Sequence, residues 1–240
     1  MSIPIEAQRE LFGATRMPDL RARHLLWVGA GGVVAFVTSF VFGDLLTLPL
    51  DLYYLIYFAV ILGFFRLYIR RTGMDWRRWT SRRLGWAIVA GVAVGVVTAA
   101  NVVSRPDTEH LTGAMLPWAV LWRGVVYGAV DGILMFAFPW IVTWRAFDAE
   151  SGRFRRKIGA AATAWLLTLV VTTTYHLGYA DFRSRKIIQP NIGSAMAAIP
   201  TIVTANPVAS CITHVAIHVA AVLHSPYTEL FLPPHRERAP

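Results

Sequence analysis

Apolar side chains occur in long uninterrupted runs along this chain. A helix that spans a bilayer needs about 20 mostly apolar residues. That window selects seven segments: residues 25–46, 51–69, 84–103, 116–144, 158–177, 187–205 and 207–223. Pro190 and Pro200 interrupt the sixth segment, a pattern that favours a broken or re-entrant helix. The pattern therefore predicts an all-α protein, a polytopic transmembrane helical bundle of about seven membrane segments.

The segments predict one membrane domain over residues 25–224, between an N-terminal tail (1–24) and a C-terminal tail (225–240). The composition is 55% hydrophobic and only 15% charged, which excludes an ordinary soluble domain and predicts contact with the lipid bilayer. The first apolar run follows a mixed-charge stretch and ends without a small-residue cleavage pattern, so we expect no cleaved signal peptide. A single cysteine, Cys211, excludes an intrachain disulfide.

The formal net charge is +9, but the arginines lie in short loops between apolar segments. This distribution indicates membrane topology and anionic-lipid contacts, and no nucleic-acid partner is expected. The N-terminal tail and loops 66–83 and 145–157 are basic and fall on one side if the first four segments each cross once. The positive-inside rule then predicts a plasma (inner) membrane protein with a cytoplasmic N-terminus. Loop 181–186, with two arginines and a lysine, breaks this pattern.

The fourth segment places ionisable groups at membrane depth. Arg123, Tyr127 and Asp131 are spaced four apart and form one stripe along a helix. Arg123 and Asp131 are then about 12 Å apart, so each needs a partner on another helix. Arg123 can alternatively extend to a lipid headgroup. Asp131 lies near mid-span, where a structural hydrogen bond and a catalytic role are equally compatible with the sequence.

Three histidines lie in later segments. His214 and His218 share one helix face, and His176 ends the fifth segment. Structural hydrogen bonds explain an isolated pair equally well, but three imidazoles that converge predict a divalent metal site, such as zinc. The alternatives are haem, with His176 and either His214 or His218 as axial ligands, and a transporter with a His/Asp proton relay. Cys211 lies three residues before His214 and is best interpreted as a small buried hydrophobe.

The order of these features resembles the CAAX-protease and bacteriocin-processing (CPBP, or Abi) family of intramembrane metalloproteases. Its pattern is EExxxR, often ending in Phe-Arg-Gly, then FxxxH, then HxxxN or HxxxD. The match covers roughly residues 115–223: Trp122-Arg123-Gly124 resembles the end of the first motif, His176 the second, and His214 with His218 the third. The resemblance implies a bacterial-type hydrolase that acts on a membrane-embedded peptide or protein.

In that family His176 would help to activate a water, while His214 and His218 would stabilise the oxyanion or bind the metal. The candidate catalytic residues are therefore these three histidines with Asp131 and Arg123. The chain departs from the pattern, because Trp118 and Ala119 occupy the glutamate positions, Thr172 replaces the Phe and His218 replaces the Asn or Asp. A divergent hydrolase and a non-catalytic relative both remain open. We expect no efficient peptidase activity unless Asp131 supplies the missing carboxylate.

Overall fold

The computed structural model describes residues 17–234, with side chains from residue 21 onward. Every regular element in this part of the chain is helical. Five helical stretches are long and apolar enough to cross a membrane: Arg21–Leu45, Leu50–Thr72, Leu84–Val103, Met115–Ala146 and Phe154–Leu177. The all-α fold is thus confirmed, and five of the seven expected segments correspond to helices of membrane-spanning length.

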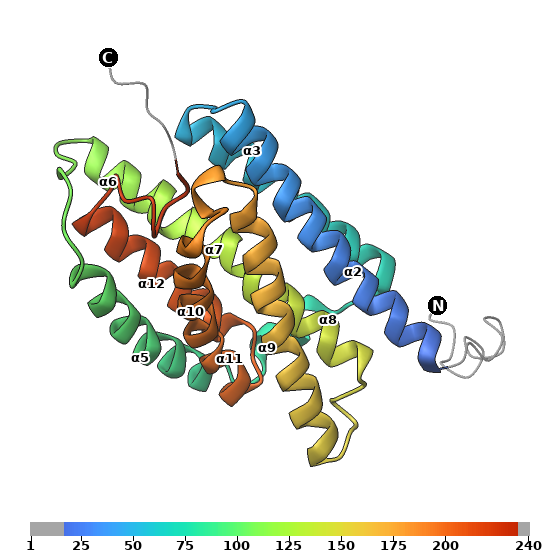
Figure 1. The fold of residues 1–240 in the computed structure, drawn as a ribbon. Helices are drawn as coiled ribbons and strands as arrows, with labels where there is room; N and C mark the ends of the chain where they lie inside the picture. Colours follow the sequence, from blue (N-terminus) through green and yellow to red (C-terminus); the bar gives the residue numbers. More distant parts are fainter. Residues whose placement is uncertain (1–16, 235–240) are drawn as a thin grey trace.

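The first two spans pack side by side with the fifth. The first consists of α2 (Met17–Thr38) and a π-helical turn, η1 (Ser39–Leu45). The second is α3 (Leu50–Thr72), and the short α4 (Trp76–Ser81) follows it, so the expected loop 66–83 is largely helical. The fifth is α9 (Phe154–Leu177), which runs beside α2 (Figure 1). The Ser39 hydroxyl of η1 donates to the Tyr175 carbonyl of α9 at 2.7 Å.

The fourth span forms the centre of the bundle. Its most apolar window is 78% buried, whereas the windows of the other four spans are 28 to 39% buried. It comprises α6 (Met115–Ala119), α7 (Tyr127–Gly132) and α8 (Phe138–Ala146), with π-helical turns η2 (Val120–Val126) and η3 (Ile133–Ala137) between them. A π-helical turn inside an α-helix often marks a functional site. These two turns lie on either side of α7, the six-residue helix that contains Asp131.

The sixth expected segment is not a single helix. Two 3-10 turns, η4 (Ala180–Phe182) and η5 (Arg185–Ile187), lead into α10 (Ile188–Ala197) and α11 (Ile199–Thr204). Pro200 lies in the first turn of α11 and cannot donate to the carbonyl four residues earlier, so the helix breaks there. With 10 and 6 residues, each of the two helices is too short to span a bilayer, so residues 187–205 form the broken helix that Pro190 and Pro200 indicated and not one continuous span.

The last described helix, α12 (Val208–His224), lies between α5 (Leu84–Val103) and the fourth span (Figure 1). The Asn206 side chain accepts a hydrogen bond from Val208 N at 2.9 Å and so satisfies the first backbone N–H group of the helix. At 17 residues α12 is shorter than a full span. Residues 225–234, the described part of the expected C-terminal tail, continue from α12 and end in the buried Leu232, Pro233 and Pro234.

The two basic loops lie at the same end of the bundle, which we call the basic end. Arg78 of α4 pairs with Glu150 at 2.7 Å, and Arg145 donates to the Thr72 carbonyl at 2.8 Å. The guanidinium of Arg21 lies 5.3 Å from the centre of the Phe147 ring, so α2 also begins there. The remaining basic residues of the N-terminal tail, such as Arg9 and Arg16, lie outside the described residues.

The exceptional loop 181–186 lies at the opposite end, where nearby acidic groups offset its charge. Arg183 pairs with Asp44 at 3.1 Å, and the Lys186 Nζ lies 3.5 Å from a Glu229 carboxylate oxygen. Two of its three cations are therefore matched by carboxylates. The loop is a local exception to the charge rule, and α9 still crosses from end to end.

Because both basic loops lie at one end of the bundle, we expect reporter fusions at residues 75 and 150 to lie on the same side of the membrane. The positive-inside rule makes that side cytoplasmic. The measurement is the activity of a phosphatase and a fluorescent-protein fusion at each position. A phosphatase signal from either loop would contradict the orientation.

Candidate metal centre

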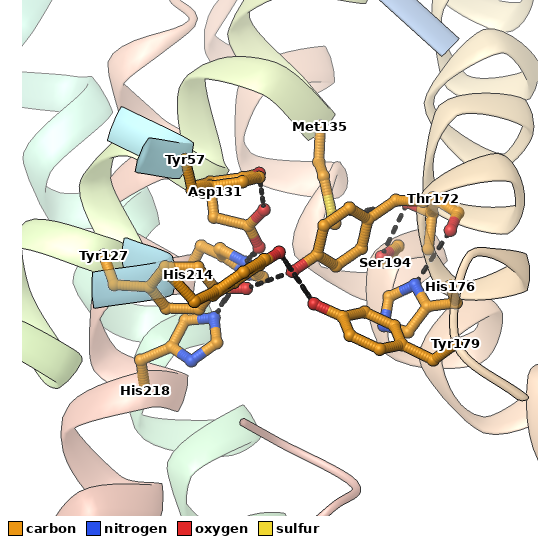
Figure 2. A network of polar contacts seen from close by, with 12 residues as sticks. Tyr57, Tyr127, Asp131, Met135, Thr172, His176, Tyr179, Ser194, His214 and His218 are labelled. Atoms are coloured by element: carbon orange, nitrogen blue, oxygen red, sulfur yellow. Dashed lines mark hydrogen bonds and ion pairs between the residues drawn. The ribbon is translucent and has the colours of Figure 1, made fainter. Parts of the chain in front are cut away.

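Three buried side chains from two helices converge on one point. Asp131 Oδ2 lies 2.6 Å from His214 Nε2 and 3.8 Å from His218 Nε2, and the two Nε2 atoms are 3.0 Å apart (Figure 2). Asp131 comes from α7, and both histidines lie on one face of α12, as their spacing predicts. Among the described residues these form the group whose ligand atoms all lie within 4.8 Å of one another. Asp131 and His214 thus find partners across helices.

Small residues allow the two helices to approach so closely. A Cβ atom at Gly128 would lie 2.9 Å from the Val215 Cα, and one at Gly132 would lie 3.1 Å from the Cys211 Cα. Gly124, one turn earlier, faces Val219 in the same way. Small residues four apart are the usual means of close helix contact in membranes. This glycine stripe brings the Asp131 carboxylate within reach of the α12 imidazoles.

A second glycine stripe lies on the opposite side of α12. A Cβ atom at Gly91 would lie 2.5 Å from the Ala209 carbonyl oxygen, and one at Gly95 would lie 3.0 Å from the Ala216 Cβ. The Thr213 hydroxyl donates to the Gly91 carbonyl at 2.9 Å. The small residues that the sequence shows in 91–95 therefore pack against α12, which is clamped from both sides.

The three groups can each offer one ligand atom to a shared cation. One imidazole nitrogen offers either one proton or one lone pair. His214 Nε2 therefore cannot serve both Asp131 Oδ2 and His218 Nε2 as a hydrogen-bond partner. Tetrahedral ligands about 2.0 to 2.2 Å from zinc would lie roughly 3.3 to 3.5 Å apart, and the observed separations of 2.6, 3.0 and 3.8 Å bracket that spacing. The donor set fits a divalent metal with three protein ligands.

Tyrosine hydroxyls hold the carboxylate from its other side. Tyr57 of α3 donates to Asp131 Oδ1 at 2.5 Å. Four further buried tyrosine hydroxyls form their own hydrogen-bonded group beside it, with oxygen separations of 2.7 to 3.1 Å: Tyr53, Tyr127, Tyr175 and Tyr179 (Figure 2). The Tyr127 ring also packs edge-on against His218, at 4.8 Å between ring centres. A carboxylate bonded in this way is fixed in orientation before any ligand arrives.

His176 contributes from a different helix and is not a member of the close group. Its Nδ1 lies 2.8 Å from the Thr172 carbonyl oxygen, which can only accept, so Nδ1 carries the proton. The neutral ring therefore has its lone pair on Nε2. Its ring packs edge-on against Tyr175 and Phe182, with centres 5.1 and 4.8 Å apart.

One cavity connects these groups. It has a volume of about 490 Å³, and its wall includes Asp131, His176, His214 and His218. Tyr127, Tyr175 and Tyr179 line it as well. The sequence predicted a site of three histidines. In the structure the close group consists of Asp131, His214 and His218, and His176 lines the same cavity.

Arg123 lies elsewhere. Its Nε and Nη2 donate to the two carboxylate oxygens of Asp51 at 3.0 and 3.3 Å, so its partner is on α3, at the end opposite the basic loops. Trp118 Nε1 reaches the same carboxylate at 3.5 Å, and Ala119 is buried in a separate apolar cluster with Val102. None of the three residues lines the cavity. The positions matched to the family's glutamates are therefore not at this site, and Asp131 supplies its carboxylate.

Two features near the site were not predicted from the sequence. Tyr57 belongs to no motif, although three tyrosines at 53, 54 and 57 in one apolar segment could have indicated a polar contact there. The pairing of Arg123 with Asp51 joins residues 72 apart in the chain, and only the packing of α3 on the fourth span shows it. Cys211 packs against Gly132 and is not part of the ligand group.

The fold and the site define an all-α membrane protein with a buried Asp-His-His group at an internal cavity. Comparisons with protein families, with curated proteins and with solved structures gave no match. The functional argument therefore rests on the geometry.

Proposed function

We propose that the protein is a divergent, metal-dependent intramembrane hydrolase of the CPBP type. The convergence of Asp131 Oδ2, His214 Nε2 and His218 Nε2 within 4.8 Å at a membrane-buried cavity carries this proposal. Further support comes from the combination of residues, because a carboxylate and three histidines from the expected segments surround one cavity. In this arrangement Asp131 takes the place of the glutamates that the family pattern puts at positions 118 and 119.

Each residue then has a defined task. Asp131, His214 and His218 would hold a divalent cation such as zinc, which would lower the pKa of a bound water and polarise a substrate carbonyl. His176 Nε2, whose lone pair is fixed by the Nδ1 contact to Thr172, would accept a proton from a water in the cavity. Tyr57 keeps the Asp131 carboxylate in its ligating orientation.

The test is the metal content of detergent-purified protein, measured by elemental analysis. We expect about one equivalent of zinc in the wild type and a loss of at least 90% in the His214→Ala/His218→Ala protein, because two of three ligands are gone. Visible absorbance of the same samples tests the haem alternative. A Soret band that disappears with His214 would favour haem and contradict the proposal.

A single hydroxyl deletion distinguishes an effect on the metal site from an effect on helix packing. Tyr57→Phe removes the hydroxyl that orients Asp131, and such outer contacts are worth roughly 10- to 100-fold in metal affinity. Tyr54→Phe is the matched control, because the buried Tyr54 hydroxyl has no hydrogen-bond partner among the described residues. Equal zinc affinity in both variants would show that Asp131 is not held through Tyr57.

A further inference from the structure

The part of the cavity away from the metal centre is apolar and partly exposed. Val97 on α5 and Ile192 and Met196 on α10 line it, and their exposed fractions are 57, 57 and 41%. Because Val97 lies on a helix of membrane-spanning length, this exposed apolar wall is accessible to the hydrocarbon of a bilayer. Ile217 of α12 and Phe231 of the C-terminal segment complete the apolar wall.

The end of the cavity opposite the basic end is polar and positive. Arg105, which follows α5, lines the cavity there with Asn101 and Gln189, and all three are exposed. Among the described residues the Arg105 guanidinium makes no ion pair, while the Arg105 backbone bonds to the Val102 carbonyl through its N–H and to His224 Nε2 through its carbonyl. A free cation beside two amide side chains fits an anionic head group.

We propose that this cavity binds a single-chain anionic amphiphile drawn from the bilayer. Its chain lies between α5 and α10, and its head group lies at Arg105. This inference names the class of ligand that the cavity of the proposed hydrolase takes and so rests on that proposal. The volume favours one chain, because at roughly 30 Å³ for a group the size of water, 490 Å³ holds on the order of 16 such groups.

Gly193 provides a direct test of the chain position. It lines the cavity on α10, and a Cβ atom there would meet nothing within 4 Å. Gly193→Phe therefore adds bulk at the cavity wall from a position where the new Cβ displaces no neighbour. Gly63→Phe on α3 is the matched control, because a Cβ at Gly63 also meets nothing and the residue does not line the cavity.

The experiment uses palmitate that carries a mid-chain diazirine, with the full-length protein in phosphatidylcholine nanodiscs. After irradiation, peptide mass spectrometry should find the label on Ile192, Met196 or Ile217. We expect Gly193→Phe to reduce this labelling at least tenfold and Gly63→Phe to leave it unchanged. Labelling of these residues that persists in Gly193→Phe would overturn the proposal.

Competition identifies the head group. Unlabelled palmitate should compete on the order of tenfold better than hexadecanol or hexadecyltrimethylammonium, and Arg105→Gln should remove this preference while Arg105→Lys keeps it. Equal competition by the uncharged alcohol would refute an anionic head group. The metal content of the same wild-type samples keeps the two hypotheses apart: a wild type that is labelled but holds no metal would contradict the hydrolase alone, and a wild type that holds metal but is not labelled would contradict this inference alone.

Discussion

Asp131→Asn should reduce hydrolysis by roughly 10²- to 10⁴-fold, the range that loss of a positioned acid-base or ligand group produces. Asparagine has nearly the same shape and can keep the contact with Tyr57, but it lacks the negative charge that a cation and two imidazoles require. The measurement is turnover of membrane-embedded peptides, prenylated peptides and acyl esters by reconstituted, zinc-loaded protein. The wild type should show measurable turnover on at least one of these.

The control for this substitution is Asp181→Asn, because Asp181 lies in the 178–187 connection and does not itself line the cavity. It should keep wild-type turnover. Turnover that survives Asp131→Asn but disappears with His214→Ala would show that Asp131 is not a required metal ligand. A wild type that binds zinc and turns over no substrate would identify a non-catalytic relative.

Gly128→Ala should destabilise the protein and weaken its metal site together. The new Cβ would lie 2.9 Å from the Val215 Cα and 3.3 Å from the His218 Cδ2, so α12 must move away from α7. Overpacking of this kind costs typically 1 to 3 kcal/mol. Because Asp131 lies one turn further along the same helix, the movement also separates its carboxylate from His214 and His218.

Thermal unfolding in detergent and zinc titration measure these two effects. Gly63→Ala is the control, because it makes the same change on a membrane helix where the new methyl group meets nothing within 4 Å. It should leave both the unfolding temperature and the zinc affinity near their wild-type values. A Gly128→Ala protein with unchanged zinc affinity would show that the site does not depend on the close approach of α7 and α12.

Apolar run length predicted the long helices well, because a bilayer requires both length and continuous apolarity. It selected residues 187–205 as a segment, where Pro200 divides the chain into α10 and α11, the broken helix that the prolines had indicated. Residue spacing correctly predicted that Arg123 needs a partner on another helix, but it placed Arg123 on one stripe with the cavity residues. The stripe of Arg123, Tyr127 and Asp131 assumes a uniform α-helix, but η2 interrupts it, and Arg123 turns to Asp51.

The composition of the site was only partly predictable. The spacing of His214 and His218 correctly placed both imidazoles on one face, because that relation is local to one helix. That Asp131 rather than His176 completes the close group depends on how α7 packs against α12. The glycines at 124, 128 and 132 were visible in the sequence, but their partner helix could not be read from it.

The clamped position of α12 has a consequence for biogenesis. Both glycine stripes that grip it lie on helices made earlier, and at 17 residues it is marginal for membrane insertion on its own. Chains emerge from the ribosome N-terminal part first. The helix α5 and the fourth span can therefore enter the bilayer before α12 and leave a space between them for it. The helix that carries the two imidazoles is then the last of the described helices to be made, so a metal ion held by Asp131, His214 and His218 could bind only after α12 has docked.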